Sequence, residues 1–356
     1  MNICIFVGAR PNFIKVAPIL RVMEAAGVCH SLVYAGREDD PTLEPSLFDD
    51  LQMRRPDVFL GVDCENLNEL TGQVMSAFER YLQNHKTDAV IVVDDLASTM
   101  AAAIVTKKQG IRLAHLVAGT RSFDINMPKE INRLVIDGLS DLLFTAGIGG
   151  SSAATREGAE SSKIYMVGNI LMDTLRFNHQ RMQRPAVMDE LGLENGSYIV
   201  FTLNRKALID NTDELRGLMV SMMEHAGDKP VVAPLRKRAV EAVERIVSEN
   251  PQLFKGLHLV SPLGYLDFGY LTAHALGVVT DSGNVAEEAS STWCRASRST
   301  ATPNTSRPSR PDQTYSSAKI PCFLAKKSAA WWQANGSIVP SQSVGTVVPQ
   351  NASCRY

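Results

Sequence analysis

Apolar positions along the first 290 residues follow two alternating periods, and this alternation predicts the elements of the fold. Short continuous apolar runs such as NICIFVG (2–8) are typical of strands buried on both faces. Between these runs, apolar residues recur every three or four positions, as in residues 9–27, which predicts an amphipathic helix ending at Gly27. A strand–helix–strand order of this kind is typical of a parallel sheet covered by helices on both faces.

The same rhythm runs through the first half of the chain and starts again after a polar break at residues 183–197. We therefore predict an α/β fold with two doubly wound Rossmann-like domains facing a cleft, at residues 1–170 and 171–291. The predicted strands are 2–8, 29–36, 88–95, 112–119, 141–146, 163–168, 197–203, 229–235, 257–261 and 276–283. The predicted helices are 9–27, 67–86, 97–109, one from 128, 169–183, 211–225, 236–249 and one near 267–275.

The pattern stops near Ser291. Residues 292–356 contain no Glu, a single Asp (Asp312), every Trp of the chain, and many Ser, Thr and Pro residues. Such a composition predicts an aberrant, disordered tail and leaves the second domain incomplete.

Charge and composition exclude several classes of protein. A formal net charge of −2 over 356 residues argues against a strongly basic nucleic-acid binder. No apolar run reaches the roughly 18–20 residues that a membrane span needs. The six cysteines are scattered without a CxxC pair, so neither a zinc site nor a disulfide framework is indicated. Because of these cysteines we expect a reducing, cytoplasmic setting. The N-terminus has no basic region before its apolar run, so we expect a first strand and not a secretion signal.

Candidate chemistry lies where the predicted strands end. In open parallel sheets, ligands bind beyond the carboxyl ends of the strands, and several polar segments stand at such ends. We expect these segments to surround one cleft: Gly8–Arg10, Asp94–Asp95, Ala118–Arg121, Leu203–Arg205 and Asp281–Gly283.

The segment GARPNFIK (8–15) follows a strand and opens a helix. Its backbone N–H groups could bind a phosphate there, with Arg10 and Lys15 adding positive charge. The alternative is a simple turn with a helix-starting Pro11 and solvated cations.

Acidic residues follow later strands. Asp95 is a candidate general acid or base, although it also suits a helix N-cap. Glu130 and Arg133 lie three apart on one predicted helix, where an ordinary ion pair is the alternative to a catalytic role.

The segment TDSGNVAEE (280–288) joins a strand, a turn and a helix. Ser282 and Gly283 could hold a diphosphate at the helix N-terminus, and Glu288 could bind sugar hydroxyls.

In their order and spacing, five segments resemble the non-hydrolysing UDP-N-acetylglucosamine 2-epimerases. The resemblance implies a GT-B-like fold in a cytoplasmic homodimer that interconverts UDP-N-acetylglucosamine and UDP-N-acetylmannosamine for surface polysaccharide synthesis. It implies loss of the C2 proton with departure of UDP, then re-addition of UDP with reprotonation on the opposite face, without a metal or redox cofactor. The segments are GARPNFIKVAPIL, VVDDLASTMAAAIV, HLVAGTRSFDINMPKEINRLVID, VGNILMDTL and TDSGNVAEEAS.

The resemblance also assigns roles to residues of this chain. Asp95, Glu130 and Arg133 match the catalytic pattern, and Asn132 matches its Asn. The residues that match the substrate-binding pattern are Arg10, Lys15, Asn169, Arg205, Ser282, Gly283 and Glu288.

The chain departs from the family pattern at positions that move protons. Val117 replaces the Glu of His-Val-Glu-Ala-Gly, Lys129 replaces the first Glu of Pro-Glu-Glu, and Asn204 replaces a His. Loss of one acid–base group typically costs about 10²–10⁴ in rate, so we expect impaired or absent turnover. Asp94 also replaces the Gly of a Gly-Asp strand end, Arg37-Glu38 replaces Gln-His, and Ala286 replaces a Gln.

Two alternatives to an epimerase stay open: a UDP-sugar-binding pseudoenzyme, and a GT-B glycosyltransferase that shares only the fold. For the tail we hypothesise a frameshift near the codons for residues 291–293, because an alternative frame can encode family-like C-terminal segments in order. A genuine Ser/Thr-rich tail is the rival explanation, and sequencing the gene distinguishes the two.

Overall fold

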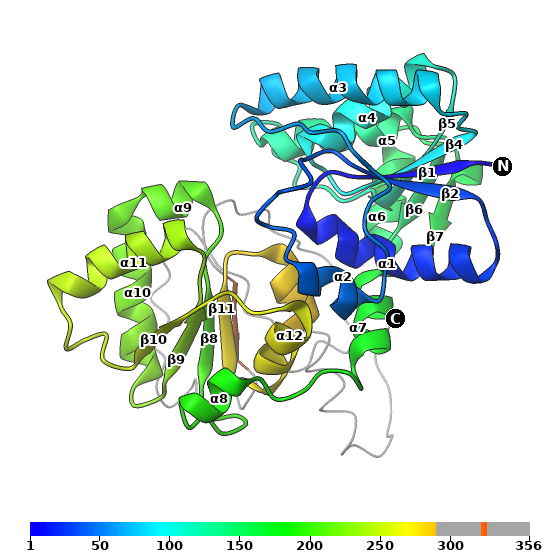
Figure 1. The fold of residues 1–356 in the computed structure, drawn as a ribbon. Helices are drawn as coiled ribbons and strands as arrows, with labels where there is room; N and C mark the ends of the chain where they lie inside the picture. Colours follow the sequence, from blue (N-terminus) through cyan, green and yellow to red (C-terminus); the bar gives the residue numbers. More distant parts are fainter. Residues whose placement is uncertain (290–321, 326–356) are drawn as a thin grey trace, which may run out of the picture. The chain divides into compact units, whose positions relative to one another are not determined.

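The computed structural model describes residues 1–289 and 322–325, and the chain divides into two compact units. The first unit is Met1–His179, and the second begins at Gln180. Both are built from strands and helices in alternation (Figure 1).

The first unit is organised around a parallel sheet. Among the described residues this sheet has seven strands in the order β3-β2-β1-β4-β5-β6-β7, and each neighbouring pair runs parallel. The strands are β1 (Ile3–Val7), β2 (His30–Tyr34), β3 (Val58–Phe59), β4 (Ala89–Val93), β5 (Arg112–Ala118), β6 (Leu142–Thr145) and β7 (Ile164–Met166). The helices are α1 (Arg10–Ala25), α2 (Pro45–Leu51), α3 (Leu67–Asn84), α4 (Ala97–Lys108), α5 (Pro128–Leu139), α6 (Ile148–Arg156), the short 3₁₀ helix η1 (Ser161–Lys163) and α7 (Leu171–Asn178).

Helices cover both faces of this sheet because successive strand residues point to opposite sides. Cys4 and Phe6 of β1 belong to a buried cluster with α3, α4 and α5, where the rings of Phe6 and Phe78 lie 5.0 Å apart. Figure 1 shows α3 and α4 on one side of the sheet and α1 and α7 on the other. The helix α7 is anchored to α1 by a 2.6 Å hydrogen bond from the Thr174 hydroxyl to the Ile14 carbonyl.

The second unit has a smaller sheet with a mixed edge. Its described strands follow the order β10-β9-β8-β11-β12, with β12 antiparallel to β11 and the other pairs parallel. The strands are β8 (Ile199–Thr202), β9 (Val231–Pro234), β10 (Leu257–Val260), β11 (Gly277–Thr280) and β12 (Cys322–Ala325). The helices are α8 (Ala186–Glu190), α9 (Lys206–Asp210), α10 (Thr212–Ala226), α11 (Lys237–Glu249) and α12 (Tyr265–His274), and residues 283–289 are also helical.

The core of the second unit follows the same alternation. Ile199 and Phe201 of β8 pack in a cluster with α9, α10 and α11, whereas Tyr198 and Val200 pack with α8 and α12 on the opposite face. Buried apolar side chains on both faces explain why β8 appears in the sequence as a continuous apolar run.

The structure confirms the predicted α/β class with parallel sheets. It adds short elements that the sequence pattern did not indicate, such as α2, α6, α8 and α9, because a helix of five to nine residues shows little periodicity. The predicted bridging helix 169–183 is shorter, at Leu171–Asn178, and belongs to the first unit.

One segment of the predicted disordered tail is a strand. Cys322–Ala325, with the apolar sequence CFLA, pairs with β11, whose other edge pairs with β8. An unpaired strand edge offers a free row of backbone hydrogen-bonding groups, which explains why an apolar segment adds to it. The other residues predicted for the tail lie outside the described part of the chain, apart from this strand.

Candidate active site

Two sharp turns shape the carboxyl end of the sheet in the first unit. Asp94, directly after β4, has a φ of +62°, and Val117, near the end of β5, has a φ of +67°. Both angles lie in the left-handed region, which favours glycine. The turn at Asp94 explains why the family pattern has a Gly at this position.

The turn from β1 into α1 is held by Asn12 rather than left open. The Asn12 side-chain oxygen accepts hydrogen bonds from the Gly8 and Ala9 amides at 3.0 and 3.1 Å. The Asn12 side-chain amide donates to the Asp94 carboxylate at 2.7 Å, and the Lys15 ammonium is also bound to that carboxylate. The amides and the lysine that we predicted to face a phosphate therefore have partners within the protein.

Arg10, the second predicted phosphate-binding cation, is also paired. Its Nε lies 3.0 Å from Oε2 of Glu44, which directly precedes α2. Both cations of the predicted phosphate site thus contact carboxylates of the same unit.

Asp95 is the centre of a small charge cluster. Two guanidinium nitrogens of Arg133 lie 2.7 and 2.8 Å from its carboxylate, and the Lys129 ammonium lies 3.2 Å from it. The Asn132 side chain donates a hydrogen bond to the Asp95 backbone carbonyl at 2.9 Å. Burial raises the pKa of Asp95, but the charges of Lys129 and Arg133 outweigh burial and hold that pKa below its ordinary value. Asp95 is therefore a stable carboxylate and a poor proton donor near neutral pH.

Glu130 is buried and binds the backbone. It accepts hydrogen bonds from the Ser122 amide and hydroxyl, both at 2.8 Å, and from the Phe123 amide at 3.1 Å. Arg133 lies 3.0 Å from the same carboxylate. Burial acts to raise the pKa of Glu130, but the hydrogen bonds from Ser122 and Arg133 lower it below its ordinary value. Glu130 therefore positions the loop before α5 and joins Asp95 through Arg133.

A second buried network lies beside this cluster. His115 Nδ1 contacts Asp137 Oδ1 at 2.6 Å, and the other oxygen of Asp137 accepts from the Gly119 amide at 2.9 Å and contacts Arg121 at 2.7 Å. The opposite ring nitrogen of His115 lies 3.0 Å from the Asp94 carbonyl. Each ring nitrogen faces an acceptor, so only the doubly protonated ring can donate to both.

Asp137 was not among the predicted site residues. Burial raises the pKa of Asp137. The hydrogen bond and charge of His115 and the charge of Arg121 lower it by more, so the pKa lies below its ordinary value. The sequence did offer a signal for Asp137: it ends the segment HLVAGTRSFDINMPKEINRLVID and lies one helical turn after Arg133.

Val117 stands where the family pattern has a Glu. The register between β5 and β6 shifts between Leu116 and Ala118, which makes Val117 part of a β-bulge, and its side chain is half-buried. Bulges are common beside active sites, where they re-aim a side chain. At this bulge the side chain is an isopropyl group, which cannot transfer a proton.

Asn169 lies two residues before the first residue of α7. Its side-chain oxygen accepts a hydrogen bond from the Leu171 amide at 3.0 Å, at the start of α7. This contact accounts for one polar group of a residue that we predicted to bind substrate.

The predicted residues of the second unit gather at two strand ends. The buried Asp281 accepts hydrogen bonds from the Asn204 amide at 2.8 Å and the Arg205 amide at 2.6 Å, linking the β8 and β11 loops. Ser282 precedes the helical residues 283–289, where Gly283 is exposed and Glu288 is half-buried.

The structure therefore brings together the three predicted catalytic residues, Asp95, Glu130 and Arg133. Lys15 and Arg10 contact other carboxylates of the first unit, and Arg205 and Ser282 lie at neighbouring strand ends of the second unit. Among the described residues, no group of three or more His, Cys, Asp or Glu side chains is arranged to hold a metal ion. No helix in the described ranges is long and apolar enough to cross a membrane.

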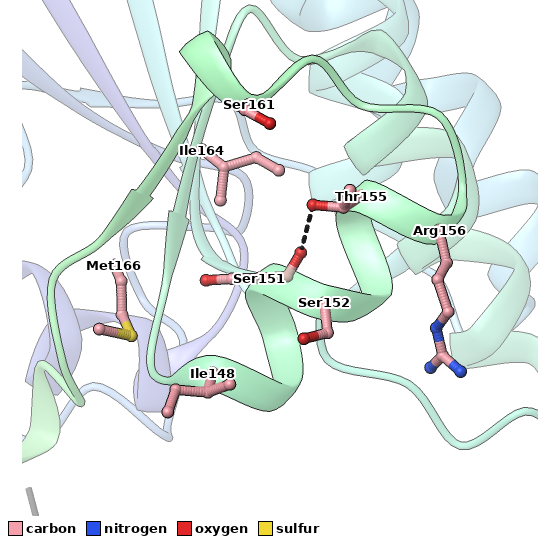
Figure 2. Close-up of a pocket in the computed structure, with 8 residues that line it drawn as sticks. All are labelled: Ile148, Ser151, Ser152, Thr155, Arg156, Ser161, Ile164 and Met166. Atoms are coloured by element: carbon pink, nitrogen blue, oxygen red, sulfur yellow. Dashed lines mark hydrogen bonds between the residues drawn. The ribbon is translucent and has the colours of Figure 1, made fainter.

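A surface pocket lies elsewhere, between α6 and β7, with a volume of about 600 Å³ (Figure 2). Hydroxyl groups from α6 and apolar side chains from β7 surround it, and none of the predicted site residues lines it. The lining residues are Ile148, Ser151, Ser152, Thr155, Arg156, Ser161, Ile164 and Met166.

Comparisons with known proteins agree with the resemblance seen in the sequence. The model of the UDP-N-acetylglucosamine 2-epimerase family matches residues 21–296. The UDP-N-acetylglucosamine 2-epimerase of Methanocaldococcus jannaschii is 30% identical over 296 residues, which cover 81% of each chain. The UDP-2,3-diacetamido-2,3-dideoxy-D-glucuronate 2-epimerase of Pseudomonas aeruginosa is 31% identical over 294 residues, covering 81% of this chain and 80% of that protein.

A solved structure agrees at the level of the fold. The crystal structure of the M. jannaschii enzyme in complex with UDP-GlcNAc and UDP has a TM-score of 0.74 and 28% identity, and the match covers 82% of each chain. Since the family match also spans most of the sequence, this chain belongs to the UDP-N-acetylglucosamine 2-epimerase family.

Proposed function

We propose that this chain binds a UDP-N-acetylhexosamine and that its 2-epimerase activity is impaired or lost. The M. jannaschii relative carries the name of a UDP-N-acetylglucosamine 2-epimerase, and its crystal structure contains UDP-GlcNAc and UDP. The binding residues we propose are Arg10, Lys15, Asn169, Arg205, Ser282, Gly283 and Glu288, with Asp95, Glu130 and Arg133 nearest the chemistry.

The state of the proton-transfer positions carries the second half of the proposal. Epimerisation at C2 needs groups that exchange a proton near neutral pH. Val117 has no ionisable group, and Asp95 is held as a carboxylate by Lys129 and Arg133. Glu130 is occupied by the Ser122 and Phe123 amides. None of these side chains is poised to donate and accept a proton in one cycle.

Proton exchange at C2 tests the proposal directly. We would incubate the full chain with UDP-N-acetylglucosamine in D₂O and follow the C2 proton by NMR, with the M. jannaschii enzyme as the positive control. Each lost acid–base group lowers the rate by about 10²–10⁴, so we expect exchange at least 100-fold slower than in the control. Saturation-transfer NMR on the same sample should still detect bound sugar nucleotide.

A restoring variant sharpens this experiment. Val117→Glu combined with Lys129→Glu returns the family pattern at both positions, and we expect measurable C2 exchange to rise. Exchange by the unmodified chain at the control rate would refute the proposed impairment. The proposed substrate class would be refuted if the chain bound neither UDP-N-acetylglucosamine nor the diacetamido-glucuronate nucleotide named for the P. aeruginosa relative.

A UDP-sugar-binding pseudoenzyme is the second candidate. Lys15, Arg10 and Asp95 are each paired with an oppositely charged side chain of the protein. This pairing favours the second candidate, because a site that transfers no proton tolerates it. It predicts nucleotide-sugar binding with no C2 exchange at any protein concentration. We also expect a homodimer, on the basis of the family resemblance, and sedimentation velocity tests this expectation.

A further inference from the structure

Asp94 is an acid at a position whose backbone favours glycine. Its φ of +62° explains the Gly of the family pattern, but it does not explain why a carboxylate stands there in this chain. An Asp tolerates this conformation better than most side chains do, because its short polar group can bond locally. The side chain therefore has a role that the backbone turn alone does not require.

The contacts of Asp94 show what that role involves. Its carboxylate binds the Lys15 ammonium and receives the Asn12 amide at 2.7 Å, and the Asp94 and Lys15 side chains are only 15% and 7% exposed. Asn12 in turn accepts from the Gly8 and Ala9 amides. A phosphate bound at the N-terminus of α1 would interact with the same groups, the Lys15 ammonium and the Gly8 and Ala9 amides.

We propose that Asp94 is an internal counterion of Lys15 that lowers the affinity of this site for phosphate groups, including the diphosphate of a sugar nucleotide. The inference rests on the proposed use of Lys15 and the Gly8–Asn12 turn in holding the diphosphate of a sugar nucleotide. An incoming diphosphate must either displace the carboxylate from Lys15 or bind beside a like charge, and both cost free energy. Asp94 thus sets the affinity of the site according to ligand charge.

Two substitutions of Asp94 separate charge from shape. Asp94→Asn keeps the size and the tolerance of a left-handed backbone but removes the charge. Asp94→Gly removes the side chain at a φ that glycine adopts freely. Asp88→Asn is the matched control, because it changes the net charge equally at the opposite, amino end of β4. There the Asp88 carboxylate accepts a hydrogen bond from the Asn2 backbone N–H at 2.7 Å.

The probes are UDP, inorganic pyrophosphate and neutral uridine, titrated by calorimetry, with NMR of the Gly8 and Ala9 amides to locate binding. A charge-assisted hydrogen bond regained by the ligand is worth about 10- to 100-fold in affinity. We expect both Asp94 variants to bind UDP and pyrophosphate tighter by this factor, with uridine binding unchanged and Asp88→Asn like the wild type.

The outcomes distinguish this inference from the proposed function. Tighter pyrophosphate binding by both variants, without UDP binding by any protein, supports the counterion and refutes the proposed substrate. Variants that bind neither anion more tightly than the wild type overturn the counterion, and wild-type binding of UDP-N-acetylglucosamine would then leave the proposed substrate standing. An equal gain in Asp88→Asn also overturns it, because net charge alone would then explain the effect.

Discussion

Asp137→Asn is the substitution that most directly tests the account of the first unit. The Asp137 carboxylate contacts three groups: His115 Nδ1 at 2.6 Å, the Gly119 backbone amide at 2.9 Å and Arg121 at 2.7 Å. The asparagine amide keeps one oxygen and replaces the other with an N–H₂ group. The buried guanidinium of Arg121 then faces a neutral group in place of the Asp137 carboxylate.

The magnitude follows from burial and charge. His115 is 1% exposed and Asp137 is 7% exposed, so water cannot replace the lost negative charge. Breaking one partner out of a buried ion pair costs about 3–5 kcal/mol, a large share of the roughly 5–15 kcal/mol that stabilises a typical domain. We expect the free energy of opening of the first unit to fall by about 3–5 kcal/mol.

Amide hydrogen exchange followed by mass spectrometry measures this loss in the unit concerned. Peptides from β5 and α5 of the full chain should exchange about 100- to 4,000-fold faster in Asp137→Asn at neutral pH. Asp173→Asn is the matched control, because Asp173 forms an exposed pair with Arg176 at 3.6 Å on α7. Equal exchange of β5 in the two variants would refute the assigned role of the network.

Three further outcomes follow from the same contacts. The pKa values of Asp95, Glu130 and Asp137 lie below their unfolded values, so in acid the unfolded chain binds more protons than the folded chain does. The stability that these three carboxylates contribute is complete above about pH 5 and is lost as pH falls through their folded pKa values, and urea unfolding at stepped pH measures this loss. Val117→Asn should stabilise the first unit by about 1 kcal/mol, because asparagine tolerates the left-handed backbone; a lower melting temperature would contradict this. Asp281→Ala removes the acceptor of two amides in the β8–α9 loop, which should exchange about 10- to 100-fold faster, while unchanged exchange would show that the carboxylate does not hold that loop.

The central parallel strands could be predicted closely because side chains on both of their faces are buried, as in β1 and β8. The run 88–95 predicted a strand that the structure places at Ala89–Val93, and the helix predicted at 97–109 is Ala97–Lys108. By contrast, α8 (Ala186–Glu190) lies in a segment that looked like a polar break. Five residues make little more than one helical turn, which is too short for a period of 3.6 to emerge.

The candidate site could be predicted in its position but only partly in its pairing. The topology of parallel strands places the strand-end residues at one edge, and the spacing of three between Glu130 and Arg133 indicated their contact. The Lys15–Asp94 contact joins residues 79 apart in sequence. It depends on the β1–β4 pairing and on a left-handed turn, neither of which a local pattern specifies.

The positions where this chain keeps the family pattern differ physically from those where it departs. The carboxylates of Glu130 and Asp281 each accept two backbone amides from buried positions, so losing either leaves donors without partners inside the fold. The three departures at proton-transfer positions fall on the half-buried Val117, on Lys129, whose side chain is 57% exposed, and on the exposed Asn204. Substitutions at such positions cost the fold little. The retained residues therefore account for the persistence of the fold, and we propose that the three substituted positions decide the state of catalysis.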